Sequence, residues 1–358
     1  MSSAGAKADP PKVLDRWIRF HLLDPDHLYT SVTLACDNAV PTPRRALRRK
    51  EGQWVLRIPR PPLGRLEYQL VVEYASGDRS WITDPANPNV VETAFGPKSA
   101  VELPGYRPPA WLAAEAIAGA STSFEITGET ADAVPITVWA PADSVPGESM
   151  PLLLVHDGPE YDNLASLTRY CAAQIAADLL PRHRVALIHP VQRDAWYSGS
   201  PQYLRTEVGA GLSHLRASYA VSEPVAVMGA SLGGLTSLLA GLLGAPHVGA
   251  VFSQSGSFFQ VGHDQDIVSG FPYFGRISRQ VRAILDTRHS DHPLRVGMTC
   301  GVLEENAPNN RDMASALARA GHKVDYLEVP DLHNYTAWRD CLDPMLTDIL
   351  RDCWGAQG

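Results

Sequence analysis

Hydrophobic and polar positions along the chain follow two different patterns, and the change comes near residue 123. Between residue 13 and about residue 105, short apolar runs with alternating or β-branched residues recur between turn signals such as Ser76-Gly77-Asp78. This pattern predicts a small immunoglobulin-like β-sandwich. The expected strands are Trp17–Leu22, Ser31–Cys36, Trp54–Ile58 and Leu66–Tyr74.

Beyond residue 123, apolar runs alternate with amphipathic helical stretches. Such alternation is typical of an α/β fold, with a mostly parallel sheet covered by helices on both faces. The expected strands are Ile136–Trp139, Leu152–His156, Val185–His189, Pro224–Met228, Val248–Ser253, Leu294–Thr299 and Val324–Val329. The expected helices are Leu164–Leu180, Thr206–Tyr219, Leu232–Leu243, Asn310–Ala320 and Trp338–Cys353, and an irregular insert follows Ser253.

These patterns predict four segments. Residues 1–12 are expected to be a disordered N-terminus, and residues 13–105 the sandwich. Residues 106–122, rich in proline and alanine, are expected to be a linker, and residues 123–358 the catalytic domain.

Charge and composition exclude several function classes. A net charge of −8 argues against a nucleic-acid surface, which requires clustered basic residues. No apolar run reaches the roughly 18 residues that a membrane span needs, and the start does not resemble a secretory signal. The five cysteines show no CxxC spacing, so we expect no metal site, no cofactor and a cytoplasmic protein. The oligomeric state is left open.

The strongest candidate for chemistry is the G-x-S-x-G pentad Gly229–Gly233. The pentad alone is weak evidence, because composition places one in roughly one chain in eight of this length. Its context is stronger, since an apolar strand leads into it and a helix is predicted to leave it. A strand–turn–helix around Ser231 is the nucleophile elbow of the α/β-hydrolase fold, which presents the serine as a nucleophile.

Backbone N–H groups must stabilise the oxyanion that such a serine generates. Leu232, the residue after the nucleophile, is expected to supply one donor. The second donor should lie in the loop after Leu152–His156, where Gly158 is the preferred candidate and Glu160 the alternative. A third alternative is an oxyanion hole with only one good donor. Pro159 has no N–H and is excluded from this role; it could also simply stiffen the turn.

In this fold the triad order along the chain is serine, acid, histidine, so the base must follow Ser231. His333 follows the expected strand Val324–Val329 by a short loop and is the candidate base. Its competitors are His263, His289, His292 and His322. His289 and His292 are expected to be solvated, and His322 is expected to have a structural role beside Gly321.

The acid should follow the strand Leu294–Thr299, and two carboxylates come just past its end. We prefer Glu304 to Glu305, and Asp312 is a third option that is expected to lie inside the next helix. The carboxylate would orient the imidazole without itself taking the proton.

Read together, several motifs resemble the enterochelin (ferric-enterobactin) esterase family, within the esterase-D-like α/β-hydrolases. The resemblance covers nearly the whole chain and rests on Asp84–Pro88, Phe95-Gly96, Pro104–Tyr106, His156–Gly158, Ser231–Gly234, Ser253–Ser257, Gly301–Glu304 and His333 with Trp338-Arg339. It implies a Ser231–His333–Glu304 triad. It also implies intracellular hydrolysis of a ferric siderophore trilactone.

Two departures from the family affect the predicted site. Where relatives usually have two glycines before the histidine, this chain has Asp331-Leu332. The family's Arg-x-x-Glu-Tyr-x-x-Asn loop keeps only Arg193 and Tyr197. We expect these two residues and Arg339 to bind substrate. A catecholate–iron complex is anionic and favours cations around it, and the candidate cations are Arg193, Arg205 and Arg339.

Three functions therefore stay open. The first is a serine esterase acting through an acyl-enzyme on a small-molecule ester, with the siderophore ester as the implied substrate. The second is a carbohydrate or general acyl-ester hydrolase, or an acyltransferase, with the sandwich as an accessory module. The third is a non-catalytic binding protein, which the complete set of triad residue types disfavours.

Overall fold

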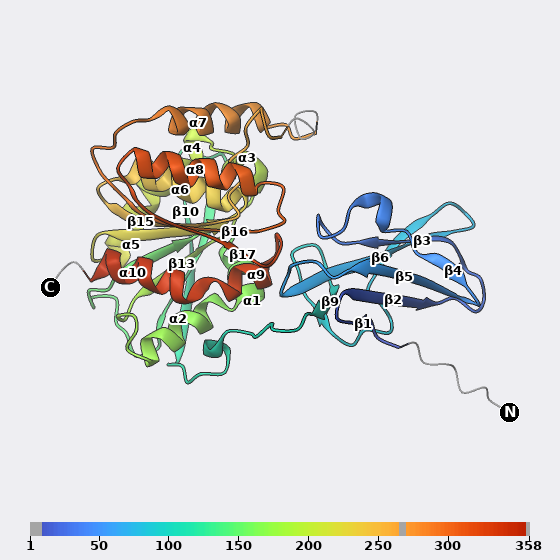
Figure 1. Cartoon of the computed structure of the whole chain (residues 1–358). Helices are drawn as coiled ribbons and strands as arrows, with labels where there is room; N and C mark the ends of the chain where they lie inside the picture. Colours follow the sequence, from blue (N-terminus) through green and yellow to red (C-terminus); the bar gives the residue numbers. More distant parts are fainter. Residues whose placement is uncertain (1–8, 265–269, 356–358) are drawn as a thin grey trace. The chain divides into compact units, whose positions relative to one another are not determined.

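The computed structural model describes residues 9–264 and 270–355, and its contacts divide the chain into two compact units (Figure 1). The first unit contains the residues up to Arg107 together with two later segments, Val302–Glu304 and Pro330–Asn334. The second unit contains Pro108–Gly301, Glu305–Val329 and the residues from Tyr335 onward.

The first unit is a sandwich of antiparallel sheets. One sheet has the strand order β1 (Lys12–Val13), β2 (Trp17–Leu23), β5 (Gln53–Pro59), β4 (Arg48–Lys50). The other has the order β3 (Tyr29–Ala35), β6 (Arg65–Tyr74), β9 (Lys98–Glu102), β8 (Val90–Val91), with β7 (Arg79–Ile82) also paired to β6. A short 3₁₀ turn, η1 (Thr42–Arg44), precedes β4. Alternate residues of these strands form the core, among them Ile18, Phe20, Leu34, Ile58 and Tyr68.

The four predicted strands of this unit are confirmed as β2, β3, β5 and β6. The basic segment Arg48–Lys50 has no apolar alternation in the sequence, yet it forms β4. These residues pair with β5 as an edge strand although all three are exposed. Their pairing comes from backbone hydrogen bonds, which the polar side chains do not reveal.

The second unit is built on one mixed sheet, which has eight strands within the described ranges. Its order is β10 (Gly119–Ile126), β11 (Val134–Pro141), β13 (Arg184–Ile188), β12 (Leu152–Val155), β14 (Val225–Ala230), β15 (Val248–Gln254), β16 (Arg295–Gly301), β17 (Lys323–Val329). The pairs β10–β11 and β11–β13 are antiparallel, whereas the strands from β13 to β17 are parallel. The parallel strands therefore end at one edge of the sheet, where α/β folds place their ligands.

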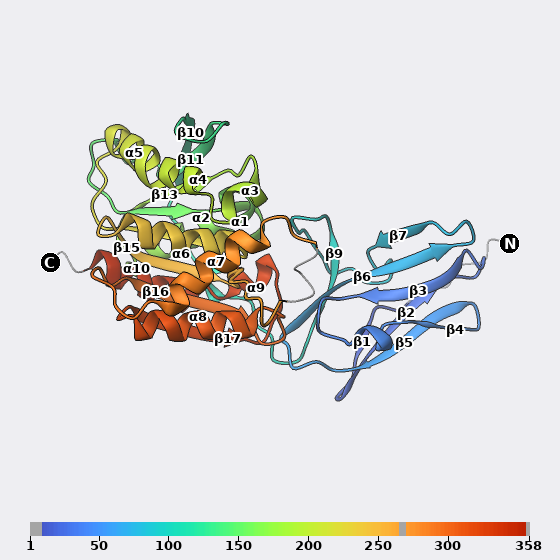
Figure 2. The same cartoon turned by 90° about the horizontal axis from the view of Figure 1, so that it is seen from above.

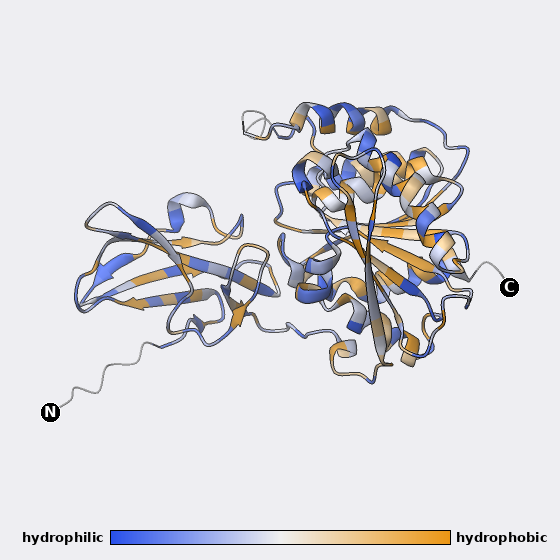
Figure 3. Cartoon of the chain, turned by 180° about the vertical axis from the view of Figure 1, so that it is seen from behind, coloured by the Kyte–Doolittle hydropathy of each residue, from blue (hydrophilic) through white to orange (hydrophobic). Residues whose placement is uncertain are grey.

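Helices cover both faces of this sheet (Figures 1 and 2). One face carries α6 (Leu232–Gly244), α7 (Phe274–Asp286) and α8 (Ala307–Arg319), and the other carries α2 (Leu167–Ala176) and α10 (Thr347–Trp354). The remaining helical segments are η2 (Ala110–Leu112), α1 (Gly158–Ala165), α3 (Arg193–Tyr197), α4 (Pro201–Arg205), η3 (Thr206–Gly211), α5 (Leu212–Ser218), α9 (Tyr335–Asp340) and η4 (Leu342–Leu346). Figure 3 shows that the strands between the two helical layers are mainly hydrophobic.

Three expectations for this unit need correction. The expected linker 106–122 overlaps β10, which begins at Gly119; the exposed, polar edge strand lacks the apolar alternation that identifies a strand. The helix expected at Leu164–Leu180 corresponds to α2, which covers only Leu167–Ala176; Ser166, with a left-handed backbone, separates it from the end of α1. The insert contains α7, whose buried Phe274, Ile277 and Val281 follow a helical spacing that was available in the sequence.

Among the described residues, no helix combines the length and the apolar character that crossing a membrane requires.

Candidate active site

The candidate nucleophile Ser231 stands between β14 and α6, as the predicted strand–turn–helix requires. Its backbone is left-handed, with φ 56° and ψ −123°, a conformation that costs free energy in a non-glycine residue. The neighbouring glycines are needed sterically: a Cβ at Gly229 would lie 2.5 Å from the carbonyl oxygen of Gly233. The strained turn thus holds a half-buried serine at the carboxyl end of a parallel strand.

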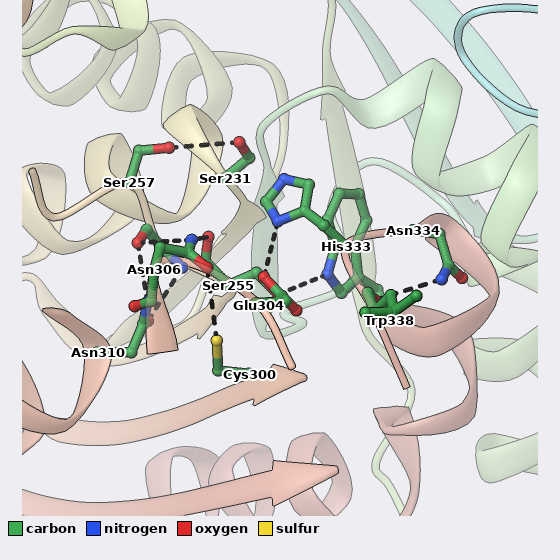
Figure 4. Close-up of polar contacts among 12 residues, drawn as sticks. Ser231, Ser255, Ser257, Cys300, Glu304, Asn306, Asn310, His333, Asn334 and Trp338 are labelled. Carbon is green, nitrogen blue, oxygen red and sulfur yellow. Dashed lines mark hydrogen bonds and ion pairs between the residues drawn. The ribbon is translucent and has the colours of Figure 1, made fainter. Parts of the chain in front are cut away.

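Gln254, the last residue of β15, and Ser257 in the loop after it hold Ser231 in place. The Ser231 N–H donates to the Gln254 carbonyl (2.9 Å), and the Ser231 carbonyl accepts from the Ser257 N–H (3.0 Å). The hydroxyl oxygens of Ser231 and Ser257 lie 3.3 Å apart (Figure 4). Sequence reasoning assigned Ser257 no role, although it ends the Ser253–Ser257 motif.

The rest of this motif is anchored by buried side chains. The Trp338 indole N–H donates to the Ser255 hydroxyl (2.9 Å), and the Gln254 amide donates to the Trp338 carbonyl (3.0 Å). Asn306 donates to the Ser255 carbonyl (2.9 Å), and Asn310 Oδ1 accepts from the Gly256 N–H (3.0 Å) (Figure 4). The sequence did not single out these asparagines, because their contacts with the loop arise only from the packing of α8 beside it.

The two candidate oxyanion donors each occupy the first position of a helix. Leu232 begins α6 after β14, and Gly158 begins α1 after the neighbouring strand β12. A helix leaves the N–H groups of its first turn without internal acceptors, so both can face an anion. A side chain at position 158 is excluded, because a Cβ there would lie 2.4 Å from Leu187 Cα. Pro159 takes the second position of α1, where its missing N–H is tolerated.

Asp157, which precedes α1, is clamped by Arg193. The guanidinium donates to both carboxylate oxygens, Nε to Oδ1 at 2.8 Å and Nη2 to Oδ2 at 2.7 Å. Asp157 is buried and has a left-handed backbone (φ 52°), whereas 37% of the Arg193 side chain is exposed. Although burial opposes the charge, the bond to Asp157 raises the pKa of Arg193 overall. Arg193 therefore fixes the turn that carries Gly158.

The expectation that Tyr197 contacts substrate is corrected by its position. The side chain is fully buried, and its hydroxyl accepts a hydrogen bond from the Asp157 N–H (3.3 Å). Burial raises the pKa of Tyr197 far above its ordinary value, so the phenol stays neutral. Tyr197 thus supports the Asp157 turn from inside the protein and is not available to a ligand.

A second buried group lies directly before this turn. His156 is fully buried; its Nδ1 lies 2.8 Å from the Ser237 hydroxyl and its Nε2 lies 3.0 Å from Glu207 Oε1. Ser237 belongs to α6 and Glu207 to the π-helical segment η3. The sequence showed His156 only as part of a family motif. The structure shows that it ties the end of β12 to the helix that leaves Ser231.

The candidate base and acid are hydrogen-bonded to each other. His333 Nδ1 lies 2.8 Å from Glu304 Oε2 (Figure 4). Glu304 follows the last residue of β16 by three positions, and His333 follows the last residue of β17 by four. Glu305, the alternative acid, is exposed.

The competing histidines lie in other surroundings. His322 is buried and accepts from the Leu294 N–H (3.0 Å), and burial lowers its pKa. His263 pairs with Asp312 at 3.1 Å, and both side chains are largely exposed. His289 and His292 are exposed.

Arg339, the remaining candidate for substrate binding, lies in α9. Its Nε donates to Asp340 Oδ1 at 2.8 Å, and 19% of its side chain is exposed. One carboxylate thus already contacts this guanidinium.

Comparisons with known proteins agree with this architecture. Residues 127–349 match the family model described as "Putative esterase". No curated protein sequence matches the chain. Two similar solved structures span almost its full length. The enterobactin esterase of Shigella flexneri, determined in the presence of enterobactin, has a TM-score of 0.77 and 18% identity, covering 98% of this chain and 97% of its own. The ferric enterobactin esterase of Salmonella typhimurium has a TM-score of 0.72 and 20% identity, covering 96% of both chains.

A ferulic acid esterase resembles a smaller part of the protein. It has a TM-score of 0.57 and 15% identity, covering 65% of this chain and 97% of its own. At these identities the three structural likenesses establish the fold, an α/β-hydrolase domain that an N-terminal β-domain precedes in the two longer relatives.

Proposed function

The chain belongs to the esterase family whose model matches residues 127–349, and on this basis we propose that it cleaves carboxylic esters through an acyl-enzyme on Ser231. In this proposal His333 is the general base and Glu304 the acid that orients it. Leu232 and Gly158 are the oxyanion donors.

The backbone of Ser231 is the observation that carries the proposal. Its φ of 56° between β14 and α6 is the strained elbow that a nucleophilic serine needs in an α/β sheet. Strain of this kind persists only where the surrounding structure holds it, and it clusters at functional sites. Ser231 is half-buried, so it is not enclosed in the protein core.

The bond between His333 and Glu304 supports the assignment of base and acid. When His333 Nδ1–H donates to Glu304, the proton is held on that nitrogen and Nε2 is left as the acceptor. We propose that Nε2 takes the proton of Ser231 Oγ as the oxygen attacks the ester carbonyl. The carboxylate then stabilises the imidazolium that forms, without taking the proton itself.

The remaining steps follow from the same groups. The tetrahedral oxyanion would accept hydrogen bonds from the N–H groups of Leu232 and Gly158. The imidazolium returns its proton to the leaving alcohol, and the carbonyl re-forms as the acyl-enzyme. Water, deprotonated by His333, then attacks the acyl group, and Ser231 recovers its proton as the acid product leaves.

Labelling with a fluorophosphonate tests the nucleophile. The folded protein is expected to be labelled at Ser231, mapped by mass spectrometry, and S231A is expected to lose the label. The matched control is S257A, which removes a neighbouring hydroxyl 3.3 Å away and is expected to keep the label on Ser231. Absence of labelling on Ser231 in the folded wild-type protein would overturn the proposal.

For the substrate, we propose an enterobactin-type siderophore trilactone, cleaved inside the cell. The motif resemblance supports this class, and so does the likeness to an esterase solved in the presence of enterobactin. Arg193 and Arg339 would face the anionic catecholate–iron complex, since 37% of the Arg193 side chain and 19% of the Arg339 side chain are exposed.

The alternative is a carbohydrate-linked or general acyl-ester hydrolase, and the likeness of 65% of this chain to a ferulic acid esterase favours it. Purified protein should be assayed with a ferric triscatecholate trilactone, a feruloyl ester and short p-nitrophenyl esters. Preferential cleavage of the trilactone supports the siderophore proposal. Cleavage of the simple esters without the trilactone removes it and leaves Ser231 as the nucleophile of a general esterase.

A further inference from the structure

The loops that carry Glu304 and His333 belong to the sandwich unit. Val302–Glu304 directly follows β16 and Pro330–Asn334 directly follows β17, yet both segments cluster by contacts with the residues before Pro108. Sequence reasoning assigned both loops to the catalytic domain and left the role of the sandwich open. Their packing gives the sandwich a role.

Leu332, next to His333, is the apolar anchor of its loop. Its side chain is 2% exposed and belongs to the hydrophobic core of the sandwich. Val302 and Leu303, next to Glu304, are partly buried against the same core. Burying a leucine side chain is favourable because it removes apolar surface from water, so Leu332 anchors this short loop.

The backbone of the loop is fastened at the residue before β6. The Gly64 N–H donates to the Pro330 carbonyl at 2.6 Å, and the Gly64 carbonyl accepts from the Leu103 N–H at 2.8 Å. A Cβ at position 64 would lie 3.3 Å from Tyr106 Cδ2, so a small residue suits this close approach. The loop thus receives a backbone hydrogen bond as well as an apolar contact.

A buried charge lies on the other side of Leu332. Asp331 Oδ1 accepts from the Leu332 N–H (2.8 Å) and from the Asn334 side-chain amide (3.0 Å). Arg65 is 3% exposed and pairs with Glu67 at 3.1 Å. Burial raises the pKa of Asp331 to about 6, and the positive charge of Arg65 opposes this rise. Asp331 and Leu332, the two residues before His333, are therefore held within the sandwich unit.

We propose that the sandwich is the positioning device of the catalytic base. In this inference Leu332 and Asp331 hold the 330–334 loop and keep His333 in register with Glu304. The inference rests on the proposed function, in which His333 is the base. It also accounts for Asp331-Leu332 at a place where family members usually have two glycines, because glycines offer no side chain for either anchor.

The first test compares Leu332→Ala with Val72→Ala. Val72 is fully buried in the same core and lies seven residues after Arg65 in β6, about 23 Å along the strand at its usual rise. We expect L332A to lower kcat for a p-nitrophenyl ester at least about tenfold, in line with the cost of a misplaced catalytic group, and to leave KM within about twofold. We expect V72A to leave kcat within about twofold, because it weakens the sandwich without touching the loop.

Proton NMR supplies a readout that a general loss of stability does not change. The downfield proton of the His333–Glu304 hydrogen bond should disappear or broaden in L332A and persist in V72A. Equal losses of kcat in the two variants, or a wild-type kcat in L332A, would contradict the inference.

A second pair of variants keeps the inference testable if L332A does not fold. Arg65→Met is expected to lower kcat and to weaken the same proton signal, and Arg65→Lys, which keeps the charge, is expected to recover part of both. A wild-type kcat in R65M together with a wild-type kcat in L332A, or no recovery in R65K relative to R65M, would contradict the inference.

His333→Ala separates this inference from the proposed function. If H333A keeps wild-type activity, His333 is not the base and the proposed function fails. If H333A is inactive while L332A and R65M are fully active, only the positioning role fails.

Discussion

His333 Nδ1 and Glu304 Oε2 lie 2.8 Å apart, and the two side chains differ sharply in their access to solvent. Only 3% of the Glu304 side chain is exposed, against 37% of the His333 side chain. A carboxylate that is shielded from water interacts strongly with the imidazole, because the local dielectric constant is low. A solvent-accessible imidazole can exchange protons with substrate and water. This asymmetry is what a general base and its orienting acid need.

Glu304→Gln is expected to lower kcat by roughly 10²–10⁴-fold, because an amide can hold His333 in the wrong tautomer and cannot stabilise the imidazolium. The measurement is kcat for a p-nitrophenyl ester. Glu305→Gln is the matched control, since Glu305 is adjacent in sequence and exposed, and it should keep the wild-type rate. Similar losses in both variants would contradict the choice of Glu304.

Pro159→Ala is expected to change kcat by no more than about threefold, because we assign the second oxyanion donor to Gly158 and not to position 159. The substitution restores an N–H at the second position of α1. A rise of roughly 100-fold or more would show that an N–H at this position can complete the oxyanion hole and that the native hole works with one good donor. The test is the steady-state rate with an activated ester.

Arg193→Met is expected to lower the free energy of unfolding by about 2–4 kcal/mol, because it leaves the buried Asp157 carboxylate without its cation. The range is set below that of a fully buried pair, since the Arg193 side chain is 37% exposed. Urea unfolding measures the change. The R193M/D157N double variant should lose less than the sum of the two single variants, and simple additivity would mean that the two residues are not coupled.

Stability should depend on pH through Asp331. Burial raises its pKa from 3.8 to about 6, so the folded protein binds the proton more tightly than the unfolded chain. The protonated carboxyl therefore favours folding below about pH 4, and this contribution is lost as the pH rises toward 6. A shift of this size corresponds to about 3 kcal/mol.

Asp331→Asn isolates this effect. Other titrating groups are common to both proteins, so the stability of wild type minus that of D331N should fall by about 2–3 kcal/mol between pH 4 and pH 7. Asparagine Oδ1 can still accept the bonds from the Leu332 N–H and the Asn334 amide. Urea unfolding at several pH values gives the difference, and a difference independent of pH would contradict the raised pKa.

The elements that the sequence predicted best are those with a local signature. Val225–Ala230 is an uninterrupted apolar run, and the small residues Gly229 and Gly233 lie on either side of Ser231. The strand, the turn and the helix could therefore be predicted from this one stretch of sequence. The edge strand β10 was missed because its side chains face solvent and only backbone pairing with β11 defines it.

The sequence by itself determined the strand, turn and helix around Ser231, and it predicted an acid and a histidine after them in the order of this fold. Tertiary structure alone decided the neighbours of each group. It buried Tyr197, turned Arg193 toward Asp157, and seated Leu332 in the core of the sandwich. The physical reason is that a side chain's burial and partners depend on segments far away in the chain. Residue type and spacing indicate the available chemistry and the local backbone conformation. The contact of Gly64 with Pro330, by contrast, arises only when the folded chain brings them together.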